Sequence, residues 1–71
     1  MTVFYELRGV EAQARLEAAA LALEAFGIRA TLLEGFDTRN LYLLFFDCTE
    51  DTDLPVAPEG TKTWRFTRLH A

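Results

Sequence analysis

The most hydrophobic stretch of the chain is Leu41-Tyr42-Leu43-Leu44-Phe45-Phe46-Asp47-Cys48. Side chains alternate between the two faces of a β-strand, and here both alternating sets are apolar. A strand that is apolar on both faces is typical of the centre of a sheet with cover on both sides. The pattern therefore predicts a central strand over residues 41–48, around which the rest of the chain is arranged.

Regular structure is also predicted on both sides of this stretch. Residues 2–8, 28–33 and 62–69 are predicted strands, rich in β-branched, aromatic and leucine residues at a period of two. Residues 10–26 are predicted as a helix, because they contain seven alanines and neither glycine nor proline. Gly27 follows as a natural left-handed cap. The predicted order is strand, helix and three strands.

One face of the predicted helix is expected to pack on the sheet. Its apolar stripe consists of Ala12, Leu16, Ala19, Ala20, Leu23 and Phe26. At the start of the helix, Glu11 is expected to pair with Arg15 four residues further on. The opposite side is mostly alanine, and Leu21 is the one large residue there that argues for a second contact.

The connections restrict the topology. A helical crossover makes strands 2–8 and 28–33 parallel, and the short connection to residues 41–48 implies an antiparallel hairpin. We prefer the order with strand 41–48 between the other two, because it places the most apolar strand at the centre; the alternative makes 2–8 and 28–33 neighbours. Strand 62–69 then takes an edge.

The predicted fold class is α+β: one helix packed on one face of a four-stranded mixed, mostly antiparallel sheet. This β-α-β-β-β order resembles half of a ferredoxin-like fold and small dimeric ligand-binding modules. The resemblance concerns fold only and carries no function.

Length and composition define the broad class of the protein. The chain has 71 residues, 51% of them hydrophobic, and a formal charge of −4, so we expect one acidic globular domain over residues 1–71. No apolar run approaches the roughly 18 residues of a membrane span. The N-terminal residues lack the pattern of a secretion signal, so we expect a cytoplasmic protein. A single cysteine, Cys48, excludes a disulfide framework and a multi-cysteine zinc site.

A chain this short buries only about 60% of its unfolded surface, and small domains usually need a staple or a partner. One helix covers one face of the sheet, so the other face is expected to expose apolar side chains, Phe4 among them, and to serve as an interface. We therefore predict a non-enzymatic module that forms a homodimer through this open face and acts by binding another protein. The predicted interface residues are Tyr42, Leu44, Phe46, Trp64 and Phe66.

The last strand suggests a second hypothesis, a nucleic-acid-binding module. Residues 60–71 carry three bases and no acid, whereas residues 36–59 carry six acids and one base. In this hypothesis bases meet phosphates and aromatic rings stack on nucleobases. The residues concerned are Lys62, Trp64, Arg65, Phe66 and Arg68, of which alternation places Arg65 on the face opposite to the others. The negative net charge disfavours a polyanionic partner, and complementarity between the acidic and basic segments explains the same pattern.

Other chemistry finds little support in the sequence. The acidic run 47–53 lacks the glycine and terminal glutamate of a calcium loop, and Cys48 is expected to be a small core residue. Its candidate base, His70, is remote in sequence, and a Glu6–Glu34 pair of carboxylates has no evident pocket. We therefore predict no catalytic residues, no metal and no cofactor. A third hypothesis is a small-molecule site where two protomers meet.

Overall fold

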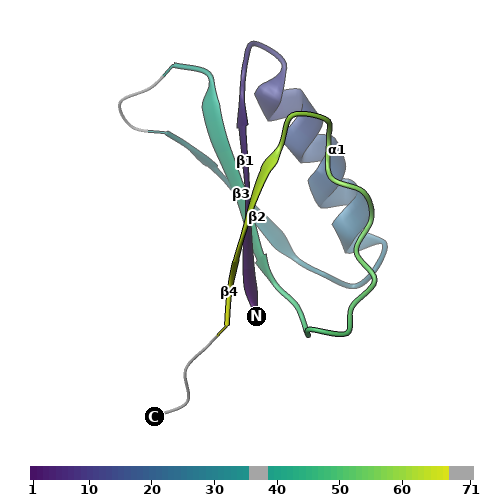
Figure 1. Cartoon of the computed structure of the whole chain (residues 1–71). Helices are drawn as coiled ribbons and strands as arrows, with labels where there is room; N and C mark the ends of the chain where they lie inside the picture. The colour runs from purple at the N-terminus through teal and green to yellow at the C-terminus, as the bar shows by residue number, and fades with distance from the viewer. Residues whose placement is uncertain (36–38, 68–71) are drawn as a thin grey trace.

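Four strands form one sheet with the order β2-β3-β1-β4 in a computed structural model that describes residues 1–35 and 39–67 (Figure 1). The elements are β1 (Thr2–Arg8), α1 (Ala12–Glu24), β2 (Ala30–Glu34), β3 (Leu41–Asp47) and β4 (Lys62–Phe66). The predicted α+β class and element order are confirmed. Cys48 lies just beyond β3. The predicted strand 62–69 is too long, because β4 ends at Phe66 and Thr67 lies past it; residues 68 and 69 lie outside the described residues.

The central position predicted for the apolar strand is confirmed, because β3 lies between β1 and β2. All three hydrogen-bonded strand pairs are antiparallel. The sheet is therefore antiparallel rather than mixed, since β3 separates the two parallel strands β1 and β2. The prediction that β3 is covered on both faces is wrong within the described chain, because α1 packs on one face only.

Helix α1 packs on one face of the sheet through part of the predicted stripe. Ala12, Leu16 and Leu23 are buried, and Ala19 and Ala20 pack partly buried against the same core. They meet Val3, Tyr5, Leu7, Leu44 and Phe46 from the sheet, together with Ile28. None of the helices within residues 1–35 and 39–67 has the length and apolarity needed to cross a membrane.

The end of α1 explains where its stripe stops. Gly27 has φ +79°, its N–H donates to the Glu24 carbonyl at 2.9 Å, and the Ile28 N–H donates to the Leu23 carbonyl at 3.0 Å. This pair of bonds is the Schellman arrangement, in which glycine accepts the left-handed conformation without steric cost. Phe26 is past the last helical turn and 56% exposed, so its predicted place in the core is wrong.

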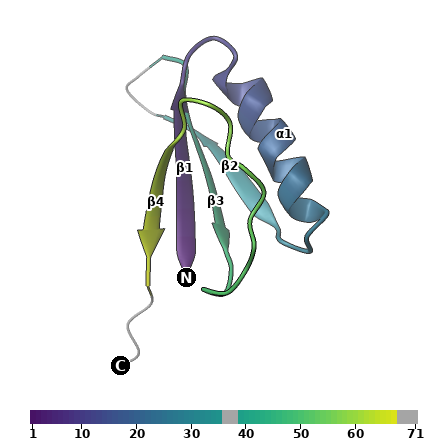
Figure 2. The same ribbon diagram turned by 45° about the vertical axis from the view of Figure 1, so that its right-hand side comes forward.

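The long connection between β3 and β4 lies on the same side of the sheet as α1 (Figures 1 and 2). Leu54 and Ala57 of this connection pack against the core beneath the helix. Helix and connection thus share one face, and no described segment covers the other. The predicted ion pair at the start of α1 is confirmed, with 3.4 Å between Arg15 and Glu11, although both side chains are exposed and such a pair contributes little.

Candidate functional site

The strand register decides which side chains lie on the uncovered face. Directly opposed residues of an antiparallel pair share a face. Phe4 is opposite Phe45 on β3 and opposite Trp64 on β4, whereas the neighbouring Val3 is opposite Phe46. We call the face that carries Phe4 the open face. Its main apolar residues are Phe4, Leu33, Leu43, Phe45, Trp64 and Phe66.

Three of the five predicted interface residues lie on the wrong face. Leu44 and Phe46 are 0% and 2% exposed beneath α1, and Tyr42 packs partly buried against the same core. Both alternating sets of β3 are apolar, so the period of two cannot tell which set faces the helix. Pairing with β1 decides which set faces the helix. Tyr5 and Leu7 of β1 are buried in the core, and they lie opposite Leu44 and Tyr42.

Trp64 and Phe66 do lie on the open face, where they are 44% and 51% exposed. The prediction missed Leu33, Leu43 and Phe45. The signal that identifies them is the strand pairing: Phe45 and Leu43 lie opposite Phe4 and Glu6 on β1, and Leu33 lies opposite Leu43. Strand pairing is a property of the tertiary structure and cannot be inferred from the alternation within one strand.

An aromatic cluster occupies the open face around Phe4. The ring centroids of Phe4 and Phe45 are 5.6 Å apart with tilted planes, and Phe66 meets Phe4 edge-on at 5.6 Å. Such geometries are favourable for aromatic pairs. The cluster is therefore preorganised by the strands.

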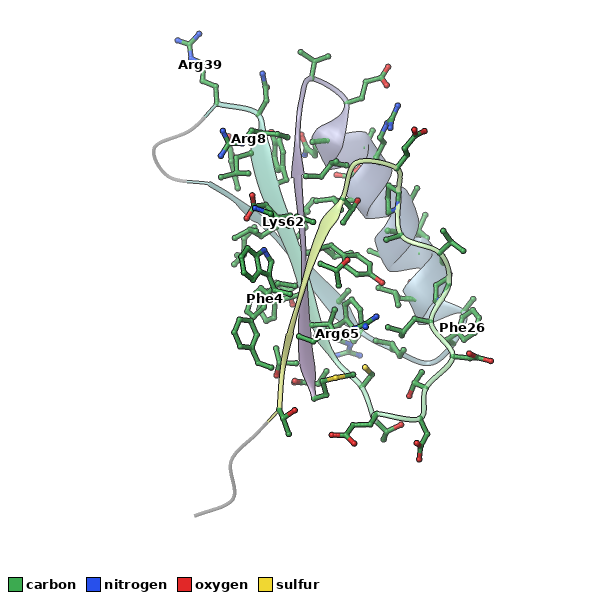
Figure 3. The ribbon with its side chains drawn as sticks, in the orientation of Figure 1. Phe4, Arg8, Phe26, Arg39, Lys62 and Arg65 are labelled. Carbon is green, nitrogen blue, oxygen red and sulfur yellow. The ribbon has the colours of Figure 1, made fainter. Side chains whose placement is uncertain are left out.

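Charged residues flank the cluster on the same face. Lys62 opposes Glu6 in the register, and its ammonium lies 5.3 Å from the Trp64 ring centroid. Figure 3 shows Phe4, Arg8 and Lys62 on one side of the sheet and Arg65 on the other. The open face thus combines an apolar centre with charges of both signs.

The basic set of the nucleic-acid hypothesis is divided between surfaces. Lys62, Trp64 and Phe66 share the open face, as alternation predicts, while Arg65 opposes Val3 on the helix side. Arg68 lies outside the described residues. Of the three bases in the hypothesis, the structure places one beside the exposed aromatic rings.

Tyr5 is the one described group whose ionisation departs from its ordinary range. Its ring meets Phe46 edge-on at 5.3 Å, and its side chain is almost fully buried. Burial raises the pKa of the Tyr5 phenol above 10.0, Arg65 partly opposes this shift, and Cys48 adds to it.

Because the pKa of Tyr5 is raised on folding, stability should fall in alkaline solution. The unfolded state loses its proton first, so the contribution of Tyr5 is fully present below pH 10.0 and is lost as the pH rises through the folded pKa. Urea unfolding on both sides of pH 10.0 should show this decline, and Tyr5→Phe should make it shallower. If stability declined with pH as steeply in Tyr5→Phe as in the unmodified chain, Tyr5 would not be its cause.

The other candidate chemistries are not brought together. Glu6 lies on the open face and Glu34, opposite Tyr42, on the other, so their carboxylates form no pair. The described residues contain no group of three or more His, Cys, Asp or Glu side chains arranged to hold a metal ion. Cys48 is partly buried beside the core. The absence of an enzymatic role stays a prediction.

Comparison with known proteins adds no relative. No family model, no curated protein and no solved structure matches this chain. The fold itself defines a small α+β protein of the β-α-β-β-β class, with one covered and one open sheet face.

Proposed function

We propose that this chain is a non-enzymatic cytoplasmic module that forms a homodimer through its open face and acts by binding another protein. The observation that carries the proposal is the aromatic cluster around Phe4 on a sheet face that no described segment covers. Large apolar side chains gathered on one face are uncommon in monomers and usually belong to an interface. Exposure of Trp64 and Phe66 leaves surface whose removal from water is favourable.

The size of the open face suits a dimer. Four strands spaced about 4.8 Å apart, each contributing roughly 17–24 Å of length, give a footprint of roughly 400 Å². Two such footprints make about 800 Å², and the relief of the side chains raises the accessible area that two copies would bury toward the lower end of the range of stable interfaces, about 1,200 Å². Burial on this scale supplies the second layer that a chain of this length lacks.

The charges on the open face are compatible with self-association. Two identical surfaces meet around a two-fold axis, so the face must complement itself. Glu6, Arg8 and Lys62 lie next to one another toward the end of β1 and provide both signs at the edge of the apolar centre. Two copies can therefore pair opposite charges while their aromatic clusters pack.

Sedimentation velocity over a range of micromolar concentrations tests the dimer. We expect the sedimentation coefficient to rise with concentration toward that of a dimer. A single monomer boundary throughout the range would contradict the proposal.

Nucleic-acid binding remains the alternative, supported by Lys62, Trp64 and Phe66 on one exposed surface. It is opposed by the net charge of −4. Trp64 fluorescence tests this alternative. Quenching by a single-stranded oligonucleotide at low salt would support nucleic-acid binding, and an unchanged spectrum would exclude it. A small-molecule site between protomers follows only if the dimer forms.

A further inference from the structure

A groove follows the outer side of β2, on the helix side of the sheet and away from the open face. It has a volume of about 600 Å³ and lies between α1 and β2. Its apolar lining consists of Ala20, Leu21, Ile28, Ala30 and Leu32. Leu21 is 68% exposed, so the one large residue on the outer side of the helix borders this groove instead of the core.

The backbone of β2 is available for further pairing along this groove, because β2 is an edge strand of the sheet. The Gly35 N–H donates to the Leu41 carbonyl at 2.8 Å, which sets the alternation of bonds along the hairpin. Leu33 and Thr31, two and four residues before Gly35, then bond inward to β3. Leu32 and its second neighbours Ala30 and Glu34 direct their N–H and C=O groups outward.

The same alternation determines where an added strand would place its side chains. Residues 30, 32 and 34 point their side chains to the helix side, and two of them line the groove. Directly paired residues share a face, so a residue that bonds to Leu32 would insert its side chain beside Leu21. Backbone pairing and side-chain burial thus occur at the same positions, as in other peptides that add a strand to a sheet edge.

Charge indicates the composition of the added strand. The α1 wall of the groove carries the exposed carboxylates of Glu17 and Glu24, with Arg29 as the basic residue at the β2 end. Glu34 adds a further acid on the same side of the strand. The excess of carboxylates favours lysine or arginine in the partner segment, next to apolar residues that fill the groove.

We propose that β2 and this groove bind an extended segment of a partner protein, in which apolar residues alternate with others and basic residues flank them on the groove side. The segment adds to β2 as a fifth strand. This inference rests on the proposed function, because it names the surface and the chemistry by which the chain binds another protein. It leaves the open face for the dimer.

A second copy of the chain fits this edge less well. Its own β2 carries no lysine or arginine to meet the carboxylates of Glu17 and Glu24 in the groove, and it adds Glu34 to them. Its β4 carries Lys62 and Arg65, but joining β4 of one copy to β2 of the next uses two different edges. Such a head-to-tail contact repeats from copy to copy and produces a ring or a filament, not a two-fold dimer.

The test uses a capped peptide whose groove-side residues are lysine, valine, valine and lysine, with threonine at the intervening positions. Amide NMR of the full chain should show shifts centred on Ala30, Leu32 and Glu34, together with Leu21. A matched peptide with glutamate in place of lysine should bind about tenfold more weakly. N-methylation of the two valines, which removes their backbone donors, should abolish binding.

Charge reversal provides the complementary test. Glu17→Lys combined with Glu24→Lys should weaken binding of the lysine peptide about tenfold, since two attractive pairs become repulsive. The matched control is Glu50→Lys combined with Asp51→Lys, which makes the same change of net charge on the exposed β3–β4 connection. We expect this control to stay within about twofold of the unmodified chain.

Several outcomes would overturn the inference: no binding at millimolar peptide, equal binding of the glutamate or N-methylated peptide, or shifts centred on Trp64 and Phe66. Protection of the Leu32 amide without peptide, with assembly beyond a dimer, would assign the edge to a second copy. If the peptide does not bind to a chain that still dimerises, only this inference is refuted. A monomer that still binds the peptide at β2 refutes the proposed dimer alone.

Discussion

Replacing Phe46 with alanine is expected to lower the free energy of unfolding by about 3–5 kcal/mol. Phe46 is 2% exposed beneath α1 and meets Tyr5 edge-on, so its removal leaves a cavity that the surrounding core fills incompletely. A small domain has a total stability near the low end of roughly 5–15 kcal/mol, so the variant should be largely unfolded at room temperature or close to it. Urea unfolding followed by circular dichroism measures the loss.

Phe45 is the matched control for this prediction, because the same change is made one residue away on the opposite face. Phe45 packs partly exposed against Phe4, so Phe45→Ala should cost only about 1 kcal/mol in the dissociated protomer. The comparison is made in dilute solution, so that the dimer does not contribute. If Phe45→Ala cost as much as Phe46→Ala, the assignment of the two faces would be wrong.

Should Phe46→Ala fail to fold at all, the milder pair Phe46→Leu and Phe45→Leu answers the same question. Phe46→Leu should then lower the free energy of unfolding by about 1–2 kcal/mol, because leucine fills much of the space but loses the edge-on contact with Tyr5. The order of the two losses, with position 46 larger, is the decisive result.

The second large effect concerns self-association. Trp64→Glu should weaken the dimer about 100-fold, because buried tryptophans are common hot spots and the new carboxylate would be desolvated in the interface. Trp64 also supports Lys62 through the cation–π contact at 5.3 Å. Sedimentation velocity at concentrations where the unmodified chain dimerises should show the variant as a monomer.

Val56→Glu is the control for this change, since Val56 is 97% exposed on the β3–β4 connection and away from the open face. It introduces the same charge and should leave the dimer unchanged within about twofold. Both variants should keep the circular dichroism spectrum of the fold. Dimers of equal strength in Trp64→Glu and the unmodified chain would exclude the open face as the interface.

The fold was predictable from local patterns to a large extent. Alternation, alanine content and Gly27 located all five elements, and the double-sided apolarity of Leu41–Phe46 correctly placed this strand at the centre of the sheet. The helix stripe was correct as far as Leu23. It failed at Phe26 because the Schellman bonds at Gly27 end the helix before that residue.

The candidate site was less predictable, since it depends on register between strands. Alternation predicted that Trp64 and Phe66 share one face, and that Arg65 lies on the other. It offered no basis for choosing between the leucine and phenylalanine sets of β3, both of which satisfy a period of two. The choice of Tyr42, Leu44 and Phe46 for the open face was therefore wrong, and Leu43 and Phe45 occupy it instead.

The amino-acid sequence by itself determined the elements, their order and the surplus of apolar side chains over what one helix covers, because these depend on interactions between residues close in the chain. Only the tertiary structure decided which apolar set of β3 is buried beneath the helix and which stays on the open face. Pairing of β1 with β3 places Val3 opposite Phe46 and Phe4 opposite Phe45. A shift of one residue in that register would exchange the two faces, since the side chains of a strand alternate at every residue.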